Sequence, residues 1–135
     1  MKISINGTEL KQDKIYTSDL FGNKKPNITS TKKNNSNLFT TIMVDPDAPY
    51  PENPTGKYFI HLLVVNSNDI KVDYYPPNPP IDSNPHRYQV FLFKQSKYIS
   101  TNITNPGSNF DLDDFIKSNE LEIIDKFEFK VKKLK

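Results

Sequence analysis

Polar groups that could form a binding site occur at three places in this chain, each inside or beside a strongly apolar segment. Two carboxylates, Asp45 and Asp47, follow the apolar run that ends at Val44. The only two histidines of the sequence, His61 and His86, belong to other apolar segments. Imidazoles can donate hydrogen bonds to an anion, and a carboxylate beside them can fix an imidazole tautomer or hold an ammonium group. A single histidine in an apolar strand is more often a satisfied core residue, but two of them together with the carboxylates predict one shared pocket.

The two aspartates stand on a loop that the sequence makes stiff. Pro46 and Pro49 lack the N–H group that a central strand needs, so the strand has to end here. Residues before proline are restricted to extended conformations, which limits Asp45 and Ala48 as well. A strand therefore delivers two carboxylates onto a rigid loop, as in many binding sites.

The same residues allow two catalytic alternatives. Ser83, His86 and Asp45 could form a hydrolytic triad, although a serine on a proline-flanked loop lacks the pattern of a nucleophile elbow. Asp45, His61 and His86 could instead hold a metal ion, since two imidazoles and one carboxylate are a familiar ligand set. A non-enzymatic binding module is the first interpretation, and a hydrolase or metal-dependent enzyme is the alternative.

The elements that must position these residues are mostly strands. The almost uninterrupted apolar run over 58–65 predicts a central strand covered on both faces. Phe127, Phe129 and Val131 alternate with charged residues, which predicts a half-buried strand. Further strands are expected at 3–5, 9–11, 39–44, 70–75, in the second half of 84–93, and near Ile28 within an otherwise irregular segment from 16 to 37.

One short helix is predicted over 111–118. Asp111 has a suitable side chain for the N-cap, and Phe110 and Phe115 are spaced for a hydrophobic staple. Strands outnumber helices, and no regular alternation of strands and helices occurs. The predicted fold class is therefore mainly β, a sandwich of two antiparallel sheets.

Composition restricts the class of protein further. The 135 residues suffice for one domain, expected to span 1–135, and the absence of cysteine excludes a disulfide framework and a thiol nucleophile. A net charge of +2 gives no strong nucleic-acid footprint. No apolar run approaches the ~20 residues of a membrane helix, and the N-terminus lacks a signal-peptide pattern. A soluble, cytoplasmic, monomeric protein without a cofactor is expected.

Three segments carry a resemblance to a known family. The segments 45–49 (DPDAP), 61–66 (HLLVVN) and 86–88 (HRY) resemble, in motif and in order, the signature segments of the phosphatidylethanolamine-binding protein family. This family includes the Raf kinase inhibitor protein and plant flowering-time regulators. The resemblance covers nearly the whole chain and is strongest from Phe39 to Gln95.

The resemblance implies two antiparallel β-sheets and a small cavity that takes an anion such as phosphate or a phospholipid headgroup. It implies a non-enzymatic regulator of signalling whose partners are a phosphate or phosphoethanolamine-type headgroup and a kinase or other signalling protein. The implied ligand-binding residues are Asp45, Ala48, Pro49, Phe59, His61, Pro79, Pro80, His86 and Tyr88. The Ala48–Pro49 peptide bond is expected to be cis, which proline permits at low cost.

Two further expectations concern the electrostatics of this cavity. Arg87 is expected to be the structural partner of Asp47 under the cavity floor. Anion binding is expected to weaken as the pH rises through the histidine range if a protonated imidazole contributes.

The chain also departs from the family pattern. Pro76 and Asn78 stand where the family usually has glycines, which is expected to narrow or reshape the cavity mouth. The C-terminal helix of animal members has no counterpart after the last predicted strand, so the cavity is expected to be more open.

Overall fold

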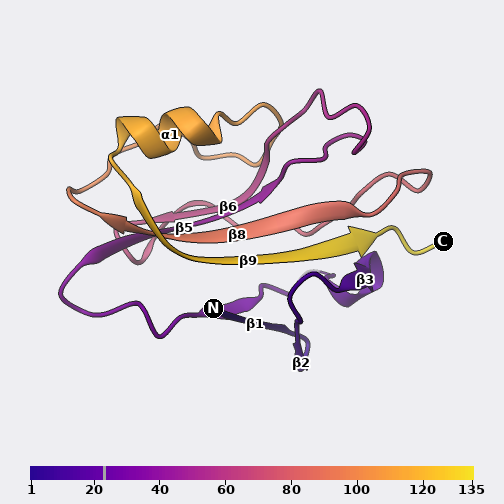
Figure 1. Cartoon of the computed structure of the whole chain (residues 1–135), viewed down its shortest axis with the longest axis horizontal. Helices are drawn as coiled ribbons and strands as arrows, with labels where there is room; N and C mark the ends of the chain where they lie inside the picture. Colours follow the sequence, from indigo (N-terminus) through magenta and orange to yellow (C-terminus); the bar gives the residue numbers. More distant parts are fainter. Residues whose placement is uncertain (23) are drawn as a thin grey trace.

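The elements of the protein lie in layers (Figure 1). The computed structural model describes residues 1–22 and 24–135. A six-stranded sheet lies in the middle, with a three-stranded sheet on one face and the helix α1 (Leu112–Ser118) on the other. No helix in the described residues combines the length and the apolar character needed to cross a membrane.

The two sheets contain nine strands in the described part of the chain. The large sheet has the order β3 (Ile15–Thr17), β9 (Glu122–Lys132), β8 (His86–Gln95), β5 (Leu38–Asp45), β6 (Phe59–Val65) and β7 (Asp69–Val72). The small sheet has the order β2 (Thr8–Glu9), β1 (Lys2–Ile5) and β4 (Asn27–Thr29). The predicted fold class, mainly β with two sheets and one short α-helix, is confirmed.

The expectation that all pairs are antiparallel is wrong at one edge. β3 runs parallel to β9, with Ile15 opposite Lys130. No hairpin joins these strands, because almost the whole chain lies between them, so their relative direction is set by packing rather than by a turn. The segment from 16 to 37 is also less irregular than predicted, since it contains the end of β3, a 3-10 helix (Ser18–Leu20) and β4.

Several strand boundaries differ from the sequence prediction, and two of them have a clear local cause. Asn6 and Gly7 both have positive φ, 50° and 78°, which makes a tight two-residue hairpin and places β2 at Thr8–Glu9 rather than at 9–11. β7 ends at Val72, because the chain then turns away toward the proline-rich segment.

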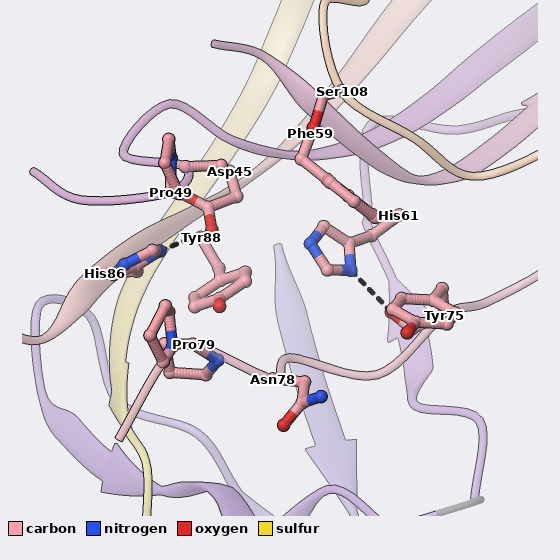
Figure 2. Close-up of a pocket in the computed structure, with 12 residues that line it drawn as sticks. Asp45, Pro49, Phe59, His61, Tyr75, Asn78, Pro79, His86, Tyr88 and Ser108 are labelled. Carbon is pink, nitrogen blue, oxygen red and sulfur yellow. Dashed lines mark hydrogen bonds and ion pairs between the residues drawn. The ribbon is translucent and has the colours of Figure 1, made fainter. Parts of the chain in front are cut away.

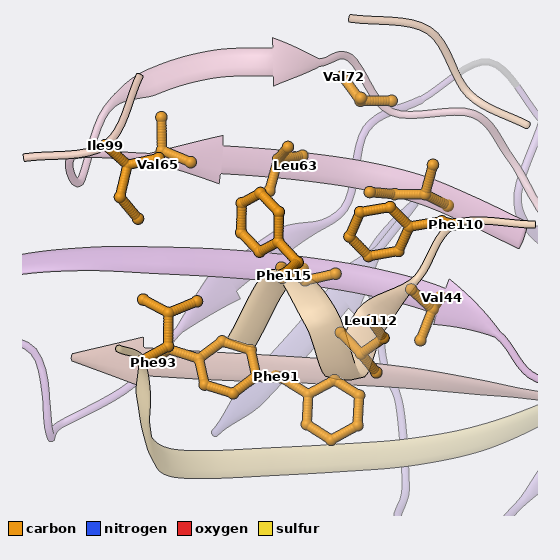
Figure 3. Packing of buried hydrophobic residues seen from close by; sticks show 13 residues of the cluster. Val44, Leu63, Val65, Val72, Phe91, Phe93, Ile99, Phe110, Leu112 and Phe115 are labelled. Carbon is orange, nitrogen blue, oxygen red and sulfur yellow. The ribbon is translucent and has the colours of Figure 1, made fainter. Parts of the chain in front are cut away.

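Each face of the large sheet has its own apolar core. On one face Leu112 and Phe115 of α1 pack over the central strands, against residues such as Leu63 and Phe93 (Figure 3). On the other face the small sheet contributes side chains that pack against those of β5, β6, β8 and β9. The predicted double coverage of the central strand is therefore confirmed, since β6 contributes to both clusters.

The helix begins as its sequence predicts. The Asp111 carboxylate accepts a hydrogen bond from the Asp114 N–H at 3.0 Å, which satisfies one of the free donors of the first turn. The rings of Phe110 and Phe115, which flank this cap, lie 5.6 Å apart. This contact is the predicted hydrophobic staple.

Replacing the cap is expected to have a small, local effect. Asp111→Ala should lower the free energy of unfolding by about 1 kcal/mol, because the Asp114 N–H loses its acceptor. Urea denaturation measures the change, and Asp113→Ala is a control in the same turn that is not the N-cap residue. An equal loss in both variants would contradict the capping role.

The pairing of the strands brings three sequence segments to one end of the large sheet. β5 pairs antiparallel with both β6 and β8, with Asp45 opposite Phe59 and Val44 opposite Gln89. The last residue of β5 therefore lies beside the first residues of β6 and β8. The polar segments of the sequence meet at this place.

Candidate functional site

A cavity of about 240 Å³ lies at this end of the sheet. This volume is below the roughly 300–1,000 Å³ of pockets for drug-sized molecules, so the cavity suits a smaller group. Figure 2 shows that Asp45, His86 and Tyr88 line one side, with His61 and Tyr75 on the other side. The cavity therefore joins side chains from β5, β6 and β8 with the segment after β7.

All nine residues that the resemblance implied for the site line this cavity. They are Asp45, Ala48, Pro49, Phe59, His61, Pro79, Pro80, His86 and Tyr88. The Ala48–Pro49 peptide bond is cis. Whether these residues bind a ligand stays a prediction.

Three further lining residues, Tyr75, Asn78 and Ser108, were missing from the predicted site. Asn78 could have been found, because it lies among the prolines of the predicted cavity mouth. Ser108 carries no such signal, since it comes from a loop that reaches β6 through the hydrogen bond from the Ile60 N–H to the Gly107 carbonyl, 2.8 Å. Long-range loop placement of this kind cannot be inferred from local pattern.

His86 is held on both sides of its ring. Its Nδ1 lies 2.7 Å from Asp45 Oδ2, and its Nε2 lies 2.9 Å from Ser83 Oγ. The Ser83 hydroxyl in turn donates to the Asn84 carbonyl at 2.7 Å, so it offers only a lone pair to the ring. Both ring nitrogens of His86 are therefore engaged by oxygen atoms of the protein.

This arrangement has the connectivity of a serine triad, but its serine is buried. Ser83 is only 4% exposed and is absent from the cavity lining, so its hydroxyl cannot reach a bound ester. Its proton is also directed to the Asn84 carbonyl rather than to the imidazole, which therefore does not act as a base toward it. The hydrolase alternative thus lacks an accessible nucleophile in the form that was predicted.

The metal alternative also meets a difficulty at His86. Both ring nitrogens of His86 are engaged by protein atoms, so neither offers a free lone pair. Among residues 1–22 and 24–135, no group of three or more histidine, cysteine or acidic residues is placed to hold a metal ion. Asp45, His61 and His86 share the cavity but do not form the three-ligand set considered above.

Asp47 and Arg87 form a second ion pair beside the cavity. The carboxylate accepts hydrogen bonds from the Arg87 backbone N–H at 2.7 Å, from Nε at 3.1 Å and from Nη2 at 2.9 Å. Burial by itself would raise the pKa of Asp47, but the hydrogen bonds and charge of Arg87 outweigh it and lower that pKa below its usual 3.8. The contact expected between these residues is present.

His61 differs from His86 because one side of its ring is free. Its Nδ1 lies 2.6 Å from the Tyr75 carbonyl, which can only accept, so Nδ1 carries the proton. Nε2 has no hydrogen-bond partner in the described part of the chain, and it faces the cavity (Figure 2). Burial lowers the pKa of His61 to about 4, although the Tyr75 carbonyl and Asp45 favour the charged form. The ring is therefore neutral near pH 7 and presents a bare acceptor.

Tyr88 adds a phenol hydroxyl to the cavity, beside Asp45. Burial raises the pKa of its phenol, and the nearby Asp45 carboxylate adds to the effect, so the hydroxyl stays neutral and keeps its proton. Its ring packs edge-on against His61, with centroids 5.3 Å apart. Asn78 and Ser108 add polar groups to the lining.

The comparisons with known proteins agree with this architecture. A family model described as phosphatidylethanolamine-binding protein matches residues 4–126. A phosphatidylethanolamine-binding protein homolog of Acanthamoeba polyphaga mimivirus is 44% identical over 103 residues, which are 70% of this chain and 72% of the homolog. The protein MOTHER of FT and TFL1 homolog 2 of Oryza sativa subsp. japonica is 31% identical over 97 residues, which are 64% of this chain and 55% of that protein. The aligned region thus spans only about half of the rice protein.

Solved structures share the fold at lower identity. The carboxypeptidase Y inhibitor, in complex with its cognate proteinase, superposes with a TM-score of 0.81 at 20% identity, over 98% of this chain and 82% of that chain. The phosphatidylethanolamine-binding protein from Plasmodium vivax superposes with a TM-score of 0.75 at 16% identity, over 98% of this chain and 84% of that chain.

The fold and the cavity define a β-sandwich protein with a small cavity, lined by both polar and apolar side chains, where three strands of one sheet meet. The chain belongs to the phosphatidylethanolamine-binding protein family.

Proposed function

We propose that this protein is a non-enzymatic binding protein whose cavity takes a phosphate group or a phosphoethanolamine-type headgroup. The proposal rests on which polar atoms of the cavity already have hydrogen-bond partners in the protein and which do not. Asp45 and both ring nitrogens of His86 are engaged with protein atoms, whereas His61 Nε2 faces the cavity and has no partner among the described residues. Tyr88 adds a hydroxyl that keeps its proton. One free acceptor and one neutral donor in a small cavity suit a compact polar group.

We also propose that the protein acts in signalling through contacts with another protein, such as a kinase. The carboxypeptidase Y inhibitor, which shares the fold, is seen in complex with its cognate proteinase, and this supports a protein-contact mode for the same scaffold. In this chain the cavity mouth includes the exposed side chains of Tyr75 and Asn78, so a bound headgroup would alter the surface that a partner meets.

A matched pair of tyrosine variants tests the headgroup proposal. Tyr88→Phe is expected to weaken phosphoethanolamine binding about tenfold, because a hydrogen bond to a charged group is lost. Tyr74→Phe is the control, since the Tyr74 hydroxyl is buried, has no partner among residues 1–22 and 24–135, and does not line the cavity. Titration followed by backbone amide chemical shifts measures both affinity and location.

In the wild-type protein the amides of the cavity segments, 45–49, 59–61 and 86–88, should shift most. Shifts confined to other surfaces, or equal affinities of the two tyrosine variants, would contradict the proposal. Turnover of a phosphate ester by the wild-type protein would favour the enzymatic alternative instead.

A further inference from the structure

The orientation of His61 has a consequence for the class of phosphate that the cavity can hold. The Tyr75 N–H donates to the His61 carbonyl at 2.9 Å, while His61 Nδ1 donates to the Tyr75 carbonyl at 2.6 Å. These two contacts fix the backbone and the ring of His61 together. If the proton were on Nε2 instead, the unprotonated Nδ1 would lie against the Tyr75 carbonyl oxygen, and two acceptors would face each other. Nε2 therefore points into the cavity as an acceptor.

The groups around His61 do not supply the missing proton. Asp45 on β5 is engaged by His86 and by the Asp47 N–H. The two ring nitrogens of His86 on β8 contact Asp45 and Ser83 rather than His61. Tyr88 faces His61 with its ring edge, and burial keeps its phenol neutral.

A lysine ammonium group lies at the rim of the cavity. Lys133 Nζ donates to Asn78 Oδ1 at 2.5 Å, and Asn78 lines the cavity. This ammonium group can attract any anion, because a point charge does not distinguish one phosphate oxygen from another. It therefore adds affinity without selectivity between types of phosphate.

We propose that the cavity selects phosphate monoesters over phosphate diesters, because only a monoester carries a P–O–H group that can donate to His61 Nε2. This inference rests on the proposed function and names the ligand class within it. A diester anion would place an oxygen lone pair against the nitrogen lone pair and leave a buried acceptor unpaired, which costs binding free energy. A monoester monoanion satisfies the same nitrogen with its own proton, and no covalent bond changes.

The second ionisation of the ligand sets the expected pH dependence. A phosphate monoester loses its last proton with a pKa of about 6, so its affinity should fall about tenfold per pH unit above that value. A diester has no such proton, and its weak binding should change little over the same range. The low pKa of His61, about 4, keeps the imidazole from supplying the proton itself near neutrality.

Monomethyl and dimethyl phosphate are the sharpest probes. At about pH 5 both carry one negative charge, since the second pKa of the monoester is about 6, and neither has an ammonium group that could donate to His61. We expect monomethyl phosphate to bind at least tenfold more tightly to the wild-type protein, as judged from one hydrogen bond to a charged group. Isothermal titration or amide chemical shifts give the ratio of the two dissociation constants.

Two variants separate selectivity from general affinity. His61→Phe removes the acceptor, so the ratio of the two constants should fall close to one, whereas Lys133→Met should weaken both ligands and leave the ratio unchanged. Lys132→Met is a matched control for charge, because Lys132 is exposed and lies outside the cavity. If His61→Phe does not fold, the ratio of the two dissociation constants for the wild-type protein, and its pH dependence, still test the selectivity.

A ratio near one for the wild-type protein would overturn the selectivity while leaving the proposed function intact. Failure of inorganic phosphate, monomethyl phosphate and phosphoethanolamine to bind at all would instead overturn the proposed function. Free glycerol 3-phosphate and phosphatidylcholine vesicles that contain phosphatidic acid distinguish a soluble source of the monoester from a lipid one, and binding of either supports the inference. Equal binding of vesicles made of phosphatidylcholine alone would contradict it.

Discussion

The free energy of unfolding of this protein is expected to fall by about 3 kcal/mol between pH 6.5 and pH 4, because His61 resists protonation in the fold. Burial lowers the pKa of His61 from 6.5 to about 4, so in this range the unfolded chain binds the proton more tightly than the folded protein. Acid therefore favours unfolding. The loss should begin below pH 6.5, proceed by at most about 1.4 kcal/mol per pH unit and level off below pH 4.

Urea denaturation at a series of pH values measures this loss, and the variant His61→Asn isolates it. The asparagine amide can still donate to the Tyr75 carbonyl, but it does not titrate. Subtracting the two pH profiles removes the contributions of all other acidic groups and of His86. A difference that stays constant from pH 6.5 to pH 4 would show that His61 is free to accept a proton in the folded protein.

Arg87→Met is expected to lower the free energy of unfolding at neutral pH by about 3 kcal/mol, because it leaves a buried carboxylate without its cation. The Asp47 side chain is 5% exposed, whereas the Arg87 side chain is 45% exposed. Removing the arginine therefore leaves the more buried partner, the Asp47 carboxylate, without a cation. The loss should become smaller as the pH falls through the range in which the stranded carboxylate can be protonated.

In the wild-type protein the Asp47 carboxylate contributes more to the free energy of unfolding at higher pH. A buried carboxylate without its cation would show the opposite pH dependence. The folded pKa of Asp47 lies below the unfolded value, so its contribution to stability is complete above about pH 4 and is lost as the pH falls further. This window lies below that of His61. The two effects can be separated by pH as well as by mutation.

A double-mutant cycle of Arg87→Met and Asp47→Asn measures the coupling between the two side chains. We expect the double variant to lose about 2 kcal/mol less than the sum of the single losses, since either change alone breaks the same contact. The surface pair Lys25 and Asp73 is the matched control, with side chains 45% and 82% exposed. Its coupling should be about 0.5 kcal/mol or less. Zero coupling between Arg87 and Asp47 would remove the structural role assigned to this pair.

Both effects arise next to the cavity, so stability and ligand binding are linked at this site. A monoester that brings a proton to His61 Nε2 would relieve the unpaired acceptor, and its binding would stabilise the folded protein by mass action. The Asp47 N–H also donates to Asp45 Oδ1 at 2.7 Å, which joins the structural ion pair to the cavity wall.

The strands near the site could be predicted because their signals are local. Pro46 and Pro49 end β5 through their missing N–H groups, and the apolar run of β6 reflects burial on both faces. The cap at Asp111 follows from the same kind of short-range rule. The order and motifs of the polar segments also pointed to the nine residues that line the cavity.

The chain alone thus determined which residues are polar, where the strands stop and which side chains stand at those stops. Only the tertiary structure decided the parallel pairing of β3 with β9, the arrival of Ser108 at the cavity and the hydrogen-bond partners of the two imidazoles. The physical reason is that a histidine ring nitrogen can either donate or accept a hydrogen bond, and the group that folding places beside it decides which. The Tyr75 carbonyl, brought close by folding, leaves His61 with one free acceptor nitrogen, whereas Asp45 and Ser83 engage both ring nitrogens of His86.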